Sequence, residues 1–169
     1  YKKILNIDPN HFESIFLLGT LYAQTKKFNE ALQFLSKAKN IQPNNADVHN
    51  NLGGVLKELE NYEKAISCYE KVIKINPNFV QAYNNLGVLF TQLSEFEKAI
   101  NFSQKAIQIN PKYAEPYNNL GLIFVHKGQH NKAITFYEKA IQINPKYADA
   151  FNNMGLAHRE LKEYNKEID

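Results

Sequence analysis

The chain is poor in the residues that mark several large classes of protein. Its 169 residues include no tryptophan, one cysteine, one methionine and one arginine, Arg159. The single cysteine, Cys68, excludes an internal disulfide, and the chain shows no Cys/His spacing of the kind that holds structural zinc. We therefore expect neither a disulfide scaffold nor a metal site, and the sequence indicates no cofactor.

Long apolar runs are also missing. No stretch approaches the roughly 18 consecutive apolar residues that a membrane helix needs, and the chain does not open with a signal peptide. The composition, with 44% hydrophobic residues and a net charge of +3, predicts a folded chain without membrane insertion. The lack of a targeting signal favours the cytoplasm.

The scarcity of arginine bears on nucleic-acid binding. All but one of the 20 basic residues are lysines. Base readout and phosphate binding favour the forked guanidinium group of arginine over a lysine ammonium. We therefore expect no nucleic-acid partner.

What the sequence does contain is a repeat of 34 residues. Five of the six prolines keep this spacing: Pro9, Pro43, Pro77, Pro111 and Pro145. Five of the seven glycines keep it as well: Gly19, Gly53, Gly87, Gly121 and Gly155. Two unrelated residue types in one period along the whole chain indicate a repeat protein rather than a single globular domain.

Other positions of the period predict two amphipathic helices in each repeat. A Leu or Met precedes each glycine, with a large residue three positions before it and another three positions after the glycine. An alanine follows the glycine by twelve residues at Ala31, Ala65, Ala99 and Ala133. The first helix is predicted to end near Thr25, Leu59, Leu93 and Lys127. The second is predicted to begin near Asn29, Glu63, Glu97 and Asn131 and to stop before the Asn-Pro or Gln-Pro pair.

This pattern of Leu-Gly, aromatic, alanine and proline columns resembles the tetratricopeptide repeat (TPR). The resemblance implies an all-α, right-handed superhelical solenoid of antiparallel helix pairs. Complete repeats span residues 12–45, 46–79, 80–113 and 114–147, with partial repeats at 1–11 and 148–169. The chain is predicted to start and to stop inside a second helix without capping repeats, so we expect it to be a segment of a longer protein.

Pairs of asparagines are the most regular polar feature. They immediately precede the Leu/Met-Gly column: Asn50-Asn51, Asn84-Asn85, Asn118-Asn119 and Asn152-Asn153. The second asparagine of each pair is similar to the asparagine ladder that lines the groove of the TPR array of O-GlcNAc transferase. The resemblance implies that first helices line a concave groove, with Val88, Leu122 and Leu156 as its apolar floor.

Side-chain amides suit a peptide-binding role because each offers two donors and two acceptor lone pairs without a charge to desolvate. A row of them can hold the backbone of an extended peptide. The alternative is that these asparagines only bridge adjacent helices. On the peptide interpretation, alanine at Asn85 and Asn119 weakens partner binding and leaves thermal stability nearly unchanged.

Other residues argue against the binding of acidic chaperone tails and against reactive side chains in this segment. Some TPR proteins clamp the acidic tails of chaperones with basic groove residues, but acidic residues stand at the matching columns here: Glu13, Asp47, Glu115 and Asp149. We therefore expect no binding of chaperone tails.

His49 and His158 occupy core columns and are predicted to be packed. Cys68 stands where other repeats have Phe34, Phe102 and Phe136, which predicts a buried, inert thiol.

The sequence thus predicts a protein-interaction scaffold that binds an extended peptide or partner segment, with no catalytic residues in this segment. Two alternatives stay open. In the first, the array is the substrate-recognition arm of a larger enzyme, such as a glycosyltransferase similar to O-GlcNAc transferase. In the second, it self-associates through open repeat ends.

Overall fold

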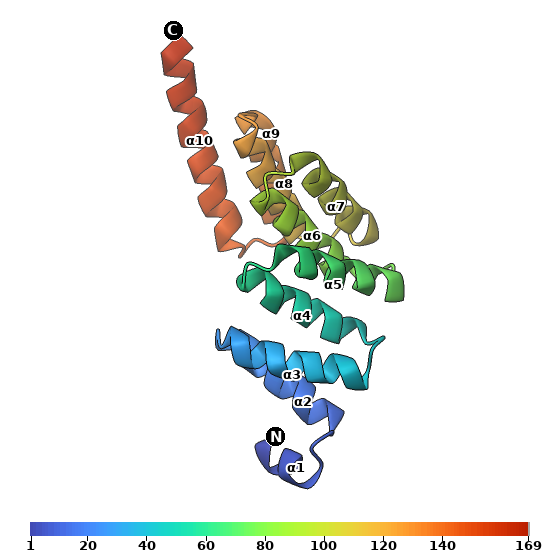
Figure 1. Ribbon diagram of the computed structural model, residues 1–169. Coiled ribbons are helices and arrows are strands. Elements are labelled where there is room, and N and C mark those ends of the chain that lie inside the picture. Colours follow the sequence, from blue (N-terminus) through green and yellow to red (C-terminus); the bar gives the residue numbers. More distant parts are fainter. Residues whose placement is uncertain (169) are drawn as a thin grey trace. The chain divides into compact units, whose positions relative to one another are not determined.

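The computed structural model describes the backbone of residues 1–168 and the side chains of residue 1 and residues 3–162. Over residues 1–168 it contains ten helices and no strand, which confirms the predicted all-α class. The helices are α1 (Lys2–Ile7), α2 (Phe12–Gln24), α3 (Phe28–Ile41), α4 (Ala46–Glu58), α5 (Tyr62–Ile75), α6 (Val80–Gln92), α7 (Phe96–Ile109), α8 (Glu115–His126), α9 (His130–Ile143) and α10 (Ala148–Ile168) (Figure 1).

The predicted boundaries hold to within one residue in the four complete repeats. The first helices end at Gln24, Glu58, Gln92 and His126, and the second helices end at an isoleucine two residues before each proline. The chain divides into two compact units, Tyr1–Ala82 and Tyr83–Asp169, and the division falls within α6. Each unit is described by itself below.

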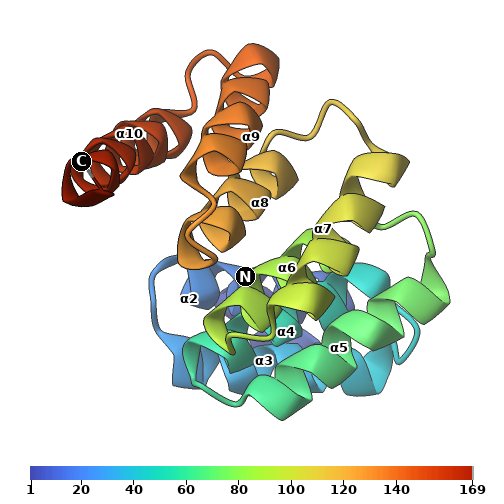
Figure 2. The same ribbon diagram turned by 90° about the horizontal axis from the view of Figure 1, so that it is seen from above.

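Helix pairs build both units. In the first unit α2 contacts α3 and α4 contacts α5, and α3 in turn contacts α4. In the second unit α8 contacts α9 and α9 contacts α10; α8 and α9 lie side by side in both views (Figures 1 and 2). The alanine column is fully buried at these crossings: Ala31, Ala65, Ala99 and Ala133 are all 0% exposed.

Glycine makes the close helix crossing possible. A Cβ atom added at Gly121 would lie 2.3 Å from Cε1 of Tyr137, and one at Gly53 would lie 2.7 Å from Cε1 of Tyr69. Any side chain at these positions would force the two helices of the repeat apart. This explains why the glycine keeps the 34-residue period.

The first helices of the four complete repeats end in the same tight turn. After α2 the N–H of Lys27 donates to the carbonyl oxygen of Tyr22 (2.8 Å), and the N–H of Lys26 donates to that of Ala23 (3.0 Å). These two hydrogen bonds define a Schellman motif, which needs one residue with positive φ. That residue occupies the same column in four repeats: Lys26 (φ 58°), Glu60 (φ 57°), Ser94 (φ 58°) and Gly128 (φ 68°).

The proline column has an equally local cause. In the α7–α8 connection the residue before proline, Asn110, has an extended backbone, as proline requires of the residue that precedes it. The side-chain oxygen of Asn110 then accepts from the N–H of Lys112 (3.0 Å), and Asn76 does the same for Asn78 (3.0 Å). The Asn-Pro pair therefore ends one repeat and shapes the turn into the next.

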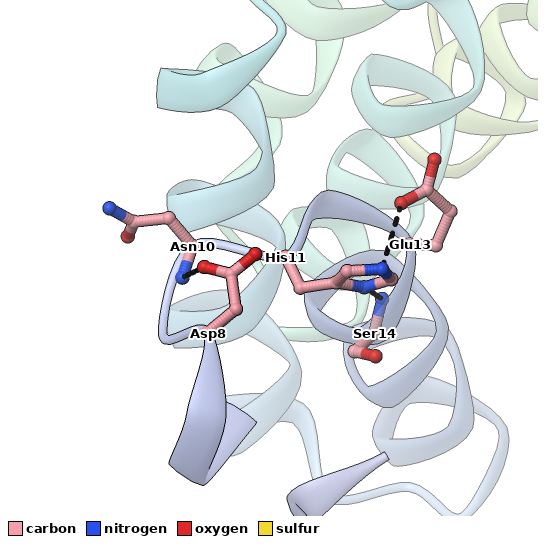
Figure 3. A network of polar contacts seen from close by, with 5 residues as sticks. All are labelled: Asp8, Asn10, His11, Glu13 and Ser14. Carbon is pink, nitrogen blue, oxygen red and sulfur yellow. Dashed lines mark hydrogen bonds and ion pairs between the residues drawn. The ribbon is translucent and has the colours of Figure 1, made fainter. Parts of the chain in front are cut away.

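The start of α2 shows a variant of this turn (Figure 3). The carboxylate of Asp8 accepts from the N–H of Asn10 (3.0 Å), and Nδ1 of His11 accepts from the N–H of Ser14 (3.3 Å) as the N-cap. Glu13 lies 3.7 Å from Nε2 of His11. The cap and the acidic residue in the first turn both favour the helix start.

The last repeat departs from the pattern. The helix pair predicted for residues 148–169 is replaced by one continuous helix, α10, so the prediction that the chain stops in a separate second helix is wrong for this structure.

Candidate functional site

The asparagine pairs lie on the first helices α4, α6, α8 and α10. The structure assigns different environments to their members. Asn84, Asn118 and Asn119 are buried (7%, 5% and 9% exposed). Asn50, Asn51, Asn85 and Asn153 are half-buried, and Asn152 is exposed.

In the second unit the pairs are joined by hydrogen bonds between neighbouring first helices. The amide nitrogen of Asn119 donates to the side-chain oxygen of Asn84 (2.8 Å), and that of Asn153 donates to Asn118 (3.0 Å). The second asparagine of one repeat thus donates to the first asparagine of the preceding repeat. Bridging of adjacent helices, one of the two interpretations of the sequence, is therefore one role of these amides.

The same position bonds differently in the first unit. The amide nitrogen of Asn51 donates to the hydroxyl of Thr20 (3.0 Å), because residues 16 and 17 of the preceding repeat are Phe and Leu instead of an asparagine pair. The hydroxyl of Thr20 in turn donates to the carbonyl oxygen of Phe16 (2.9 Å). A threonine one turn further along the helix substitutes for the missing acceptor.

A pocket of about 320 Å³ brings three predicted site residues together. Asn119, Val88 and Leu122 all line it, between α6 and α8 in the second unit. The remaining lining residues are Thr91, Gln92, Ser94 and His126. These four were not predicted as site residues, and the 34-residue period gives no signal for them because their columns vary from repeat to repeat.

The pocket combines apolar side chains with polar side chains that carry no carboxylate or ammonium group. Its floor is aliphatic, and its rim carries two amides, two hydroxyls and an imidazole. An amide has two N–H donors and two acceptor lone pairs, and the hydrogen bond to Asn84 uses one of the donors of Asn119. Such a site suits an apolar side chain next to a peptide bond.

Leu156 occupies the same column as Val88 and Leu122 but lies on α10, where it is 46% exposed. It does not line the pocket that holds Val88, Asn119 and Leu122. The structure therefore assembles part of the predicted site and leaves Leu156 and Asn152 on an open face of α10.

Three further predictions concern histidine and cysteine. His49 is packed as predicted, with Nε2 2.8 Å from the carbonyl oxygen of Pro43. The prediction for His158 is wrong: its side chain is exposed, because α10 has no second helix packed against that face. Cys68 is half-buried rather than buried, and burial raises the pKa of its thiol while Lys39 lowers it.

The described residues hold no group of three or more His, Cys, Asp or Glu side chains placed to bind a metal ion. In the same part of the chain, no helix combines the length and the apolar character that crossing a bilayer requires.

Comparison with protein families matches almost the whole chain. A model described as "TPR repeat" matches residues 19–59, 89–128 and 121–162. A second model, described as "Tetratricopeptide repeat", matches residues 46–79. A third model with the same description matches residues 1–33 and 68–101. The chain belongs to the tetratricopeptide repeat family.

Solved TPR structures share this fold. A crystal structure of MamA is 30% identical in sequence over 88% of this chain and 86% of that chain, with a TM-score of 0.76. YrrB, whose structure is described as "a TPR protein with an unusual peptide-binding site", is 24% identical in sequence. The match covers 90% of this chain and 78% of that chain, with a TM-score of 0.72. A chain in the crystal structure of the APC/C hetero-tetramer Cut9–Hcn1 is 21% identical in sequence, over 97% of this chain and 33% of that chain, with a TM-score of 0.88.

A comparison with curated protein sequences finds no match. The family and the solved structures therefore establish a TPR solenoid fold, which is typical of interaction scaffolds. They do not name a partner for this chain.

Proposed function

We propose that this TPR array is a protein-interaction scaffold that binds an extended peptide or partner segment along its first helices. The observation that carries the proposal is the pocket in which Asn119, Val88 and Leu122 meet. An amide beside an aliphatic floor provides both parts of peptide recognition: hydrogen bonds to the backbone and a site for one apolar side chain.

The role of the asparagines follows from their bonding. First asparagines such as Asn118 serve the helix contacts, because Asn118 accepts from Asn153. The hydrogen bonds of second asparagines such as Asn119 and Asn153 to the preceding repeat use one N–H donor of each amide, which has two donors and two acceptor lone pairs in all. We infer that these second asparagines, with Asn51 and Asn85 at the same column, contact the peptide backbone as the resemblance to O-GlcNAc transferase implies.

The fold of a solved relative supports the comparison in one respect. YrrB has a peptide-binding site on a TPR fold, according to the description of its structure. That likeness concerns the fold, and the peptide that this chain binds follows from its own pocket, which favours a neutral segment with an aliphatic side chain.

A selection from a phage-displayed library of random peptides tests the proposal. Peptides that bind the chain are expected to lose about ten-fold or more in affinity for Leu122→Glu, because the carboxylate would be placed on the apolar floor. Lys132→Ala on the outer side of α9 is the matched control and should bind like the natural chain. Equal affinities for the two variants would show that the selected peptides bind elsewhere.

Self-association is the second candidate function. Phe151 and Leu156 on α10 are 45% and 46% exposed, and large exposed apolar side chains of one helix favour a protein contact. Light scattering over a range of concentrations tests it. A molecular mass that rises with concentration, and that no longer rises in Phe151→Glu, supports self-association; a constant monomer mass rejects it.

A further inference from the structure

A second hollow lies in the first unit, away from the asparagine pairs. It has a volume of about 380 Å³ and is lined by residues of α3, α4 and α5, which follow one another in blue and green in Figure 1. Leu52 and Leu56 of α4 form its floor. Its walls are Leu32, Ser36 and Lys39 of α3 and Asn61, Lys64, Ser67 and Cys68 of α5.

The other repeats show what normally fills this place. In each of them a phenylalanine of the second helix lies against an aromatic ring of the first helix. The ring centroids are 5.4 Å apart for Tyr22–Phe34, 5.4 Å for Phe90–Phe102 and 5.3 Å for Phe124–Phe136. In repeat 46–79 the two positions hold Leu56 and Cys68 instead. Both rings are missing, and the hollow contains these two smaller side chains.

The lysine column adds a cation to the same arrangement. The ammonium of Lys98 lies 5.1 Å from the centre of the Phe90 ring, and that of Lys132 lies 5.5 Å from the centre of the Phe124 ring. Lys64 is the equivalent residue of repeat 46–79, where no ring stands at the first-helix position. Lys64 therefore lines the hollow without the cation–π contact that its counterparts make.

A second lysine distinguishes this wall from its counterparts. Lys39 stands where the three following repeats have Ile73, Ile107 and Ile141. Its charge reaches the hollow, since it lowers the pKa of the Cys68 thiol against the effect of burial. Neither Lys39 nor Lys64 forms an ion pair with an acidic residue in the described part of the chain, and no carboxylate lines the hollow.

We propose that this hollow docks an aromatic side chain of a partner peptide whose neighbouring residues are acidic. The ring takes the space that phenylalanine fills in the other repeats, under the ammonium of Lys64, and a carboxylate of the partner pairs with Lys39. The serine hydroxyls and the Asn61 amide surround the ring with donors for the peptide backbone. This site does not depend on the proposed peptide groove, because it uses none of the asparagine pairs.

The position of Cys68 provides a direct readout of occupancy. It is the single cysteine of the chain, so the rate of alkylation by N-ethylmaleimide reports access to the hollow alone. The probes are three seven-residue peptides with the centres Asp-Phe-Asp, Asp-Ala-Asp and Lys-Phe-Lys. We expect only the Asp-Phe-Asp peptide to slow alkylation and to shift backbone amide resonances of α5, with an affinity at least about ten-fold above the other two.

Two substitutions of Cys68 test whether binding depends on the open volume of the hollow or on the thiol group itself. Cys68→Phe places in this repeat the side chain that the other three carry, and it should reduce Asp-Phe-Asp binding at least about ten-fold by filling the hollow. Cys68→Ser keeps the hollow open and should bind within about two-fold of the natural chain. Lys39→Ile, which restores the side chain of the other repeats, should also weaken binding and covers the case that Cys68→Phe does not fold.

Four results would overturn the proposal. The first is equal affinity for all three peptides. The second is unchanged binding by both Cys68→Phe and Lys39→Ile. The third is protection of Cys68 by phosphatidylserine vesicles but not by the peptide, which would identify a membrane surface as the partner. Resonance shifts confined to Val88 and Leu122 would assign the peptide to the first-helix pocket and also reject docking at Cys68.

Discussion

The side-chain amide of Asn119 donates a 2.8 Å hydrogen bond to the side-chain oxygen of Asn84, and neither residue is more than 9% exposed. This contact joins two first helices of successive repeats through largely buried side chains. A buried amide that loses its partner is left with the full cost of desolvation. The asparagine ladder of the second unit therefore stabilises the array as well as offering groups to a peptide.

Asn84→Ala is expected to lower the free energy of unfolding by about 1–3 kcal/mol, because it leaves the amide of Asn119 buried without its acceptor. Chemical denaturation followed by circular dichroism measures this. Asn152→Ala is the matched control, since the same substitution is made at an exposed position on α10 and should change stability by less than about 0.5 kcal/mol. Equal effects of the two substitutions would contradict a structural role of the ladder.

The same contact revises an expectation from the sequence. We expected alanine at Asn119 to affect binding and to leave stability unchanged, because the pattern shows a regular polar column but not how far each member is covered. Burial depends on the neighbouring repeat: Asn51 at the same column is half-buried and bonds to Thr20. Periodicity therefore predicts the position of the ladder, and only the packing reveals its structural role.

Helix limits were predictable because their causes are local. Proline two residues after each second helix, and Leu-Gly within each first helix, are visible in the sequence. The positive φ of Lys26, Glu60 and Ser94 was not predicted, since these residue types do not favour it and only Gly128 at the same column signals it. The hollow at Cys68 was missed for a related reason: a cysteine in a phenylalanine column suggests burial, whereas the paired loss of the ring at Leu56 leaves space.

Gly121→Ala is expected to lower the free energy of unfolding by about 1–3 kcal/mol, because its methyl group would lie inside the van der Waals surface of the Tyr137 ring and force the α8–α9 crossing to shift. Thermal melting monitored at 222 nm measures the change. Gly155→Ala is the control at the same column of α10, where the added Cβ meets no atom of the described residues within 4 Å. It should raise stability by about 0.5–1 kcal/mol through helix propensity. Destabilisation by both would show that the column acts through something other than the crossing.

Ser94→Gly is expected to raise the free energy of unfolding by about 0.5–1 kcal/mol. Ser94 has a φ of 58° in the Schellman turn after α6, and relief of that strain exceeds the extra chain entropy that glycine brings to the unfolded state. The reverse change, Gly128→Ser at the equivalent turn after α8, should lower it by a similar amount. Denaturant midpoints of the two single variants test the pair, and changes of the same sign would refute the argument.

Alkaline pH is expected to unfold the protein through its buried tyrosines. Burial raises the pKa of Tyr137, and it raises that of Tyr113 to about 12. A tyrosine whose pKa is higher in the folded state contributes stability that is fully present below its unfolded pKa of about 10 and is lost as the pH rises above it. The denaturant midpoint should therefore be constant between about pH 7 and 8 and should fall most steeply from pH 10 upward.

Tyr137→Phe isolates one of these groups. Its hydroxyl is buried without a hydrogen-bond partner, so replacing it by hydrogen should raise the free energy of unfolding at pH 7 by up to about 1 kcal/mol. The variant should also lose less stability between pH 10 and 11.5 than the natural chain, because one buried phenol no longer ionises on unfolding. Tyr1→Phe at an exposed position is the control and should reproduce the natural pH dependence. An alkaline loss as large in Tyr137→Phe as in the control would show that burial of the Tyr137 phenol does not contribute to it.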